Sequence, residues 1–313
     1  MTVSFVASGV GVLTPPAGEP ADGDWFDYRK ELGPRGYKYL PDASKYLLAA
    51  TKHALADAGD SLAGVDPEQR GAVVGTNSGA SALHGAMDRT VLETDADDIS
   101  PALAPYFSIN LLGGRAAIEH QVTGFNLTLT SPRVAGFEAV QHSIRSARLG
   151  RASWLVACSV ETALDQPEPG VDNSETGAAV VVLEREDALT RRGGRSYGRF
   201  QAWTAFLPPS QADPARAADL VRAAYRTFGQ QAGATFPMRA VLDDSAVGSA
   251  FASALADVAP DGSVLRRTAG AGCLEPMVQV VHALREPSDR ETGGVLVLTA
   301  AAEGNVGFAL ITR

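Results

Sequence analysis

The stretch GRAAIEHQVTGFNLTLTSPRVAG, residues 114–136, decides the fold. It begins inside a helix predicted over 113–122 and continues into a predicted strand over 125–130, which is rich in Leu and Thr. The tight turn Ser-Pro-Arg at 131–133 ends the strand, and a helix is predicted over 134–149. A strand that leads through a tight turn directly into a helix is typical of layered α/β proteins.

Strands and helices alternate on both sides of this stretch. Helices are predicted where apolar residues recur at helical spacing, and strands where short apolar runs end at turn residues. The other predicted strands cover 2–13, 70–78, 152–160, 178–183, 238–242, 294–299 and 306–311, and the other predicted helices cover 41–58, 81–92, 217–231, 248–258 and 273–284. This alternation with short links indicates an α/β fold.

The chain is predicted to consist of two similar halves. An N-terminal half over 1–190 and a shortened C-terminal half over 217–313 repeat the same succession of strands and helices. Such a repeat indicates an internal duplication that sequence identity no longer reveals. The polar, proline-containing segment 191–216 is predicted to connect the halves.

Composition excludes several classes of function. The 313 residues carry 27 Lys and Arg against 36 Asp and Glu, which gives a formal net charge of −9. This balance disfavours nucleic-acid binding, which needs a basic face, and binding to an anionic membrane surface. No apolar stretch is long enough for a membrane span, and the N-terminus lacks the basic residues of a signal peptide. Because both cysteines, Cys158 and Cys273, lie in apolar runs, a reducing cytoplasm is the expected location.

Several motifs, in their order along the chain, resemble those of the β-ketoacyl synthase family. The spacing G-x-x-A-I-x-H-x-x-x-G occurs at 114–124. The other motifs are RGAVVGTN at 70–77, ISP at 99–101, ETGAAVVVLE at 175–184 and AGAGCLE at 269–275. The resemblance covers nearly the whole chain. It implies the thiolase fold, a five-layer α-β-α-β-α body made of two similar halves.

The resemblance also implies where active members carry their chemistry. They use a cysteine at the turn before the buried helix, whose thiolate accepts an acyl group, and two histidines that help to stabilise an enolate oxygen. Here Arg133 stands at the cysteine position, and Asp244 and Arg266 stand near the two histidine positions. A guanidinium is permanently protonated and has no lone pair suited to attack. The three substitutions together imply a catalytically degenerate member, a pseudoenzyme with no catalytic residues.

The three degenerate positions are expected to form a charged plug in the ancestral pocket. A carboxylate of Asp244 between the guanidinium groups of Arg133 and Arg266 would form a paired cluster, whereas an isolated buried arginine would be very costly. Three alternatives stay open: Arg133 lies in a solvated turn, Asp244 caps a helix, or Arg266 belongs to a surface pair. Ser131 is a further candidate nucleophile, although no G-x-S-x-G motif surrounds it.

No cofactor or metal site is predicted. The five histidines have no metal-ligand spacing. The Gly-rich segment 269–272 lacks the Lys-Ser/Thr ending of a phosphate-binding loop. Cys273 follows that segment at the start of a helix, a setting that lowers a thiol pKa, but its family counterpart is a small packing residue.

The resemblance implies partners as well. Family members dimerise through the strand before the nucleophile turn, here 125–130, and an edge strand of this composition needs cover. The closest functional resemblance is to the chain-length-factor subunits of bacterial type II polyketide synthases, which lack the nucleophile and pair with an active ketosynthase. The chain is therefore expected to be a non-catalytic subunit of this kind, in a heterodimer that takes part in polyketide or fatty-acid-like biosynthesis.

Two other functions remain open. In a repurposed ketosynthase-fold enzyme, Arg133 and Asp244 would act on an acyl or carboxylated substrate, because a guanidinium can hold a carboxylate through two hydrogen bonds. Alternatively, a homodimer would serve as a scaffold for an acyl carrier protein. Carrier proteins are acidic, so this scaffold needs a local basic patch, for which the candidates are Arg145, Arg148, Arg151, Arg191 and Arg192.

Overall fold

The computed structural model describes residues 4–16, 18, 24–165, 168–230, 236–259, 263–286 and 293–313. The first half contains β1 (Phe5–Leu13), α1 (Tyr28–Glu31), α2 (Asp42–Ala58), β2 (Arg70–Gly75), α3 (Ser81–Glu93), α4 (Leu111–Glu119), β3 (Asn126–Leu129), α5 (Ala135–Arg148), β4 (Trp154–Glu161), β5 (Gly177–Arg185) and α6 (Glu186–Arg191). The second half contains β6 (Gly198–Phe206), α7 (Pro214–Thr227), β7 (Met238–Leu242), α8 (Ala246–Val258), β8 (Val264–Thr268), α9 (Leu274–Arg285), β9 (Gly294–Ala300) and β10 (Asn305–Thr312).

The strands of these described segments form one hydrogen-bonded sheet in the order β3-β2-β4-β5-β1-β6-β10-β9-β7-β8. Read from each outer edge toward the centre, both halves have the same order, with β6 to β10 in the places of β1 to β5. The halves meet where β1 pairs with β6, at Val6 with Arg199 and Ala7 with Gly198. This repeated topology confirms the two similar halves that the sequence predicts.

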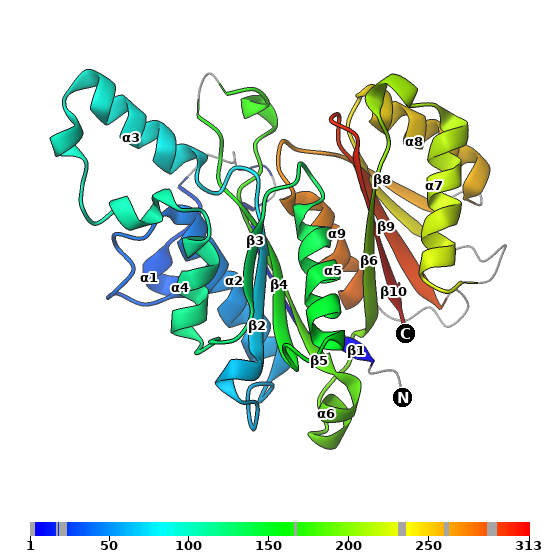
Figure 1. Cartoon of the computed structure of the whole chain (residues 1–313), viewed down its shortest axis with the longest axis horizontal. Helices are drawn as coiled ribbons and strands as arrows, with labels where there is room; N and C mark the ends of the chain where they lie inside the picture. Colours follow the sequence, from blue (N-terminus) through cyan, green and yellow to red (C-terminus); the bar gives the residue numbers. More distant parts are fainter. Residues whose placement is uncertain are drawn as a thin grey trace.

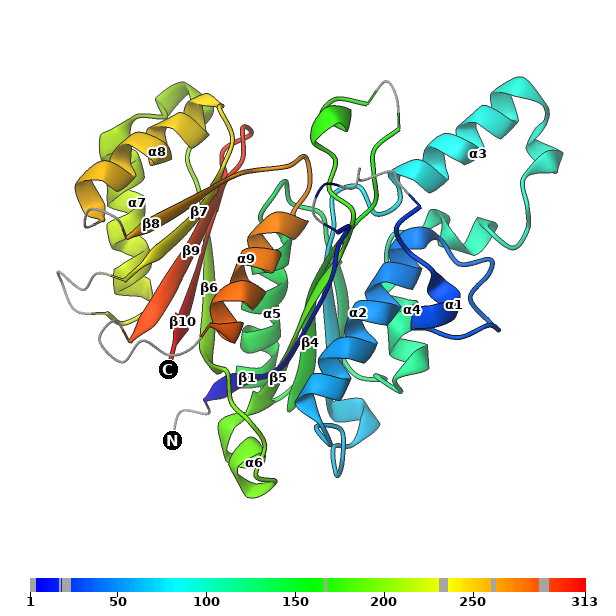
Figure 2. The same ribbon diagram turned by 180° about the vertical axis from the view of Figure 1, so that it is seen from behind.

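The chain is layered, as the thiolase-like fold requires. Helices α5 and α9 lie between the two halves of the sheet, α2 and α4 cover one outer face, and α7 and α8 cover the other (Figures 1 and 2). One apolar core surrounds the two central helices, and one lies under each outer pair of helices. Phe137 and Met277 belong to the central core, Leu47 and Trp154 to one outer core, and Phe251 to the other. The five-layer α-β-α-β-α arrangement is thus confirmed.

Two glycines fix the position of α5 in the central layer. A Cβ atom on Gly75 of β2 would lie 2.4 Å from the carbonyl carbon of Ala135. A Cβ atom on Gly136 would lie 2.4 Å from Cγ of Met277 in α9. Larger residues at these positions would push the helices apart, so the glycines hold the first turn of α5 against both β2 and α9.

The structure corrects two details of local structure. The segment 191–216 is more than a connection, because it contains the central strand β6. Strand β8 was not predicted, because its sequence VLRRT is polar and lies at an exposed edge of the sheet. Among the helices of the described segments, none is both long enough and apolar enough to cross a bilayer.

Candidate functional site

The turn between β3 and α5 lies at the head of a central helix. Arg133, the residue before the helix N-cap Val134, has a positive backbone φ of 61°. A side chain in this left-handed region costs on the order of 1 kcal/mol, so surrounding contacts must hold the turn in place. The sequence therefore puts its fixed cation at a constrained position in the central layer.

Asn77 provides those contacts. Its Oδ1 accepts the backbone N–H of Arg133 at 3.0 Å, and its Nδ2 donates to the carbonyl oxygens of Thr130 and Ser131 at 3.0 and 3.2 Å. The Asn77 side chain, in the loop after β2, thus forms hydrogen bonds with both ends of the turn between β3 and α5. Sequence reasoning missed this role, although the motif RGAVVGTN ends at this asparagine.

The guanidinium of Arg133 reaches across to the second half of the chain. Its Nη2 lies 3.0 Å from Oδ2 of Asp243, which directly follows β7. The side chains of Arg133 and Asp243 are only 11% and 21% exposed, so this ion pair is largely shielded from water. Oδ1 of Asp243 also accepts the backbone N–H of Ser245 at 3.0 Å, which fixes the carboxylate.

Arg133 is not fully satisfied by this pair. Its Nε and Nη1 atoms are buried and have no hydrogen-bond partner among the described residues. A buried donor left without an acceptor costs about 1–3 kcal/mol. No described group satisfies these two donors, and Arg133 itself offers no nucleophile at the head of α5.

The predicted plug of Arg133, Asp244 and Arg266 was wrong in two of its three members. Asp244 is exposed, and its neighbour Asp243 pairs with Arg133 instead. Arg266 is exposed on the edge strand β8 and donates to the carbonyl oxygen of Ala252 at 2.8 Å. The helix cap belongs to Ser245, whose Oγ accepts the N–H of Gly248 at 3.1 Å.

Ser131 has no catalytic partner in the described structure. Its carbonyl oxygen accepts hydrogen bonds, but no bond to its hydroxyl is found among the described residues. Each described contact of a histidine lies elsewhere, such as that of His53 with Glu31 and that of His84 with the carbonyl oxygen of Phe107. A serine without a general base in reach is a poor nucleophile.

A buried carboxylate connects this turn to the second central helix. Glu161, which is fully buried at the end of β4, accepts the backbone N–H groups of Asn77, Ser78 and Cys273 at 2.8, 2.6 and 2.9 Å. It also accepts the hydroxyl of Ser78 at 2.7 Å. Several donors on one carboxylate offset its desolvation, so Glu161 serves as a structural anchor behind Asn77.

Glu175 holds the first turn of α9 in a similar way. Its carboxylate accepts the backbone N–H groups of Gly270, Leu274 and Glu275. Burial, reinforced by the negative charge of Glu161, raises the pKa of Glu175 from 4.5 to about 7. This carboxyl group therefore binds a proton more tightly in the folded chain than in the unfolded chain.

Both native thiols are shielded. Burial raises the pKa of Cys158 to about 12, and burial followed by the charge of Glu161 raises the pKa of Cys273. A thiol reacts through its thiolate, so neither group is an effective nucleophile near neutral pH. The described residues also contain no group of three or more His, Cys, Asp or Glu side chains placed to hold a metal ion.

The raised pKa of Glu175 predicts a pH dependence of stability. Because its folded pKa lies above its unfolded value, its contribution is greatest at low pH and is lost as the pH rises from about 4.5 to about 7. The loss should be on the order of 3 kcal/mol in the free energy of unfolding. Urea unfolding at several pH values should show that Glu175→Gln flattens this slope and that the exposed control Glu68→Gln does not. An unchanged slope in Glu175→Gln would contradict the assignment.

Comparisons with known proteins agree with the fold. Residues 24–171 match the family model described as "Beta-ketoacyl synthase, N-terminal domain". No curated protein matches the chain in sequence. Many solved structures resemble the chain, and three of those that share its fold along nearly its whole length are described next.

The first of these structures is that of the ishigamide ketosynthase/chain length factor, with a TM-score of 0.80, 21% identity and 99% of each chain covered. The second is a type II polyketide synthase acyl-carrier protein in complex with its ketosynthase bound to the hexaketide, with a TM-score of 0.76, 17% identity and 100% of each chain covered. The third is a β-ketoacyl synthase from Burkholderia phymatum, with a TM-score of 0.70, 14% identity, and 99% of this chain and 100% of that chain covered. The chain thus carries a β-ketoacyl synthase N-terminal domain at residues 24–171, within a ketosynthase fold that extends along its whole length.

Proposed function

We propose that the chain is a non-catalytic, chain-length-factor-like subunit that pairs with an active ketosynthase in polyketide or fatty-acid-like biosynthesis. The observation that carries the proposal is the ion pair of Arg133 with Asp243 at the head of α5. An arginine fixed by a carboxylate at this position cannot accept an acyl group. What such a subunit contributes is shape and surface for its partner.

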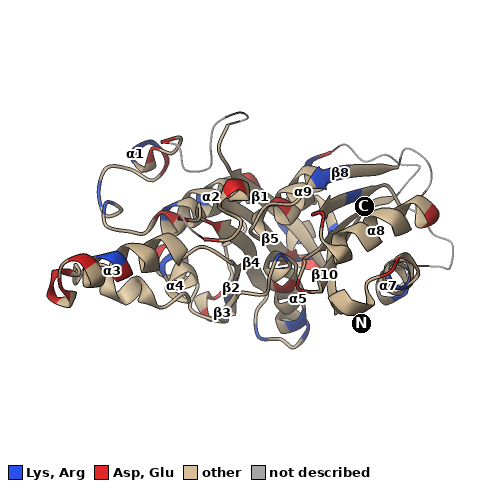
Figure 3. Cartoon of the chain, turned by 90° about the horizontal axis from the view of Figure 1, so that it is seen from above, with Lys and Arg blue, Asp and Glu red and all other residues tan. Residues whose placement is uncertain are grey.

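The edge strand β3 is the surface proposed for pairing. Its backbone positions Asn126 and Thr128 face away from β2, because the carbonyl oxygens of Phe125 and Leu129 accept bonds from β2 and neighbouring residues alternate. Helices α3 and α4 lie along the same side of the molecule as β3 (Figure 3). Large hydrophobic side chains are exposed on these helices and on the 3₁₀ turn between them: Val91, Leu92, Phe107 and Ile118.

The opposite edge of the sheet is protected against pairing. Strand β8 exposes Arg266 and Arg267, and charged residues on an edge strand oppose the addition of another strand. Strand β3, by contrast, carries no charged residue, and exposed apolar side chains lie near it. This contrast supports a dimer through β3, in which exposed apolar area near the edge is covered by the partner.

Proline substitution at the edge tests this pairing. Thr128→Pro removes an outward backbone N–H of β3 without removing a bond to β2, so we expect loss of co-purification with a co-expressed ketosynthase. Arg266→Pro is the matched control. Arg266 is the register partner of Ala240 in β7, as Thr128 is the register partner of Val74 in β2, so the two positions are equivalent in the two halves. Size-exclusion chromatography with mass detection should show a heterodimer for the wild type and Arg266→Pro. A heterodimer that survives in Thr128→Pro would contradict pairing through β3.

A repurposed enzyme is the second candidate, favoured by two nitrogen atoms of Arg133 that have no partner among the described residues. A carboxylate oxygen of a substrate would satisfy these donors. This candidate predicts turnover of a carboxylated or acyl substrate by the chain alone, abolished in Arg133→Ala while circular dichroism confirms that the variant is folded. Absence of turnover by the wild type removes it.

The scaffold for an acyl carrier protein receives less support. Of its five candidate arginines, Arg191 pairs with Asp187 at 3.0 Å and Arg192 pairs with Glu184 at 2.7 Å. These two charges are therefore already compensated. The remaining three, Arg145, Arg148 and Arg151, are exposed on and just after the last turn of α5.

A further inference from the structure

A basic cleft lies at the opposite end of the central layer from Arg133. It has a volume of about 840 Å³ and lies between the C-terminal turn of α9, the start of β6 and the end of β10. Four arginines and two glutamates contribute to its lining: Arg195, Arg199, Arg285, Arg313, Glu186 and Glu286. In a chain with a net charge of −9, such a concentration of arginines is unusual.

Both glutamates of the cleft are already paired. Glu186 binds the guanidinium of Arg199, with a closest approach of 3.0 Å, and Glu286 binds Arg239. Within the described segments, Arg195, Arg285 and Arg313 have no ion pair with an acidic side chain. The cleft therefore contains three positive charges that its own carboxylates do not compensate.

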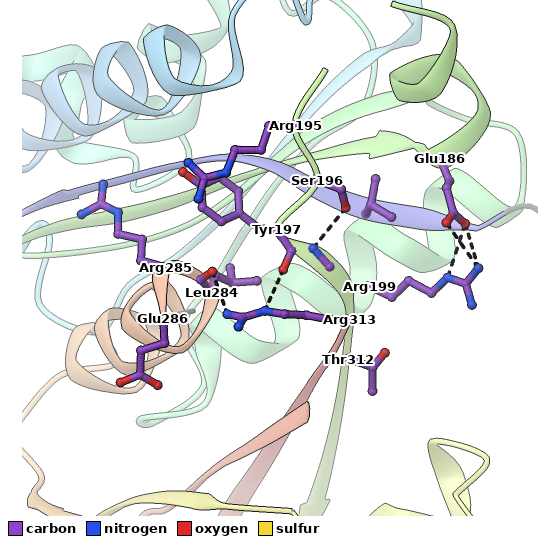
Figure 4. A pocket seen from close by; sticks show the side chains of 12 residues that line it. Glu186, Arg195, Ser196, Tyr197, Arg199, Leu284, Arg285, Glu286, Thr312 and Arg313 are labelled. Carbon is purple, nitrogen blue, oxygen red and sulfur yellow. Dashed lines mark hydrogen bonds and ion pairs between the residues drawn. The ribbon is translucent and has the colours of Figure 1, made fainter. Parts of the chain in front are cut away.

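Each of the three arginines lies near Tyr197. The side chains of Arg195, Arg285 and Arg313 surround Tyr197 and Leu284, whereas Arg199 extends away from them toward Glu186 (Figure 4). The guanidinium carbon of Arg195 lies 4.4 Å from the centre of the Tyr197 ring. The Tyr197 hydroxyl donates to the carboxylate of Asp57, whose Oδ2 also accepts the N–H of Val10.

Charge effects on Tyr197 agree with this arrangement. Burial and the hydrogen bond to Asp57 raise the pKa of Tyr197, and the charges of Arg195 and Arg285 act against that rise. Both guanidinium groups therefore lie close enough to the phenol to influence its ionisation. Asp57 is the acidic group that acts on this phenol.

Two of the arginines are anchored by backbone carbonyls. Arg313 donates to the carbonyl oxygens of Ala283 and Leu284 in the last turn of α9, and Arg285 donates to that of Val10 at 3.2 Å. These bonds fix the direction of the side chains but leave their charges uncompensated. Ser196 adds a hydroxyl, whose oxygen accepts the N–H of Gly198 at 3.1 Å and whose proton has no acceptor among the described residues.

We propose that this cleft is a binding site for a diphosphate-bearing anion, held by Arg195, Arg285 and Arg313. A single carboxylate has two oxygen atoms and cannot engage three separate guanidinium groups, whereas a diphosphate has enough oxygens and charge for all three. A concave cleft of this size fits a small molecule better than a protein surface. The site is independent of the proposed pairing, because it lies far from Arg133 and the β3 edge.

Isothermal titration with sodium pyrophosphate at constant ionic strength tests the proposal on the full chain. The wild type should bind saturably. The double variant Arg195→Gln/Arg285→Gln should bind about a hundredfold more weakly, since each of the two lost charge-assisted hydrogen bonds weakens binding about tenfold. Arg199→Gln is the matched control, because this arginine lines the same cleft but is already paired with Glu186, and it should stay within about twofold of the wild type.

One further ligand, ADP, identifies the source of the diphosphate. Tighter binding of ADP than of pyrophosphate indicates a nucleotide, and equal or weaker binding of ADP indicates a free diphosphate; both results support the site. Thermal unfolding without ligand confirms that the variants are folded. Unsaturable binding to the wild type, or equal affinities of the wild type and the double variant, would overturn the proposal in favour of a solvated face or an acidic protein partner.

Discussion

Asp243→Ala should lower the free energy of unfolding by about 2–3 kcal/mol. The substitution leaves the buried guanidinium of Arg133 without its carboxylate, and its Nε and Nη1 atoms already have no partner among the described residues. Removing one member of a fully buried ion pair costs about 3–5 kcal/mol, and the smaller figure allows for the 21% exposure of the Asp243 side chain. Urea unfolding measures the change.

The neighbouring aspartate is the control. Asp244→Ala removes an exposed carboxylate one residue away and should change the free energy of unfolding by less than about 0.5 kcal/mol. A double-mutant cycle between Arg133→Met and Asp243→Ala should give a coupling energy of about 1 kcal/mol or more. Additive effects in that cycle, or equal effects of the two aspartate substitutions, would contradict the ion pair that joins the halves.

Arg133→Cys should create one fast-reacting thiol in a chain that otherwise has none. The new side chain would stand at the N-terminal end of α5, where the helix dipole stabilises a thiolate. Cys158 and Cys273 are buried and their pKa values are raised, so they give a low background. Titration of the native protein with a disulfide reagent should detect about one thiol per chain in the variant and almost none in the wild type.

Denaturant provides the control for this titration, because all cysteines of both proteins should then react. The variant should still not condense acyl units, since no histidine has a described contact with Arg133 or Asp243. If the native variant showed no additional reactive thiol, position 133 would not lie where the dipole of the central helix can stabilise a thiolate.

The sequence predicted the architecture well because the fold depends on apolar periodicity and on the order of motifs. The stretch 114–136 showed a helix, a strand, a turn and a second helix, and the structure has α4, β3 and α5 there. The strands that the sequence did not predict are those with polar residues in or beside them. Strand β8 carries Arg266 and Arg267 at an open edge, where no apolar pattern is needed, and β6 was obscured by polar and proline residues at its ends.

The candidate site was predicted only in part. Motif order was enough to place Arg133 before the buried helix, and that position is confirmed. Counting residues along the motif could not distinguish Asp243 from its neighbour Asp244. The two aspartates follow β7 directly, but only the first is shielded from water, whereas the second is exposed. The role of Asn77 depends on two distant segments meeting in space, and no local pattern in the sequence reports such a contact.

Intact-mass spectrometry after incubation with an acyl thioester carried on an acyl carrier protein tests the central claim most directly. The wild-type chain alone should gain no acyl mass, because its central helix begins with a paired guanidinium and its two thiols are buried. An active ketosynthase treated in parallel should gain the acyl group. A stable acyl adduct on the wild-type chain, mapped by peptide digestion to Ser131 or to either cysteine, would contradict a non-catalytic subunit.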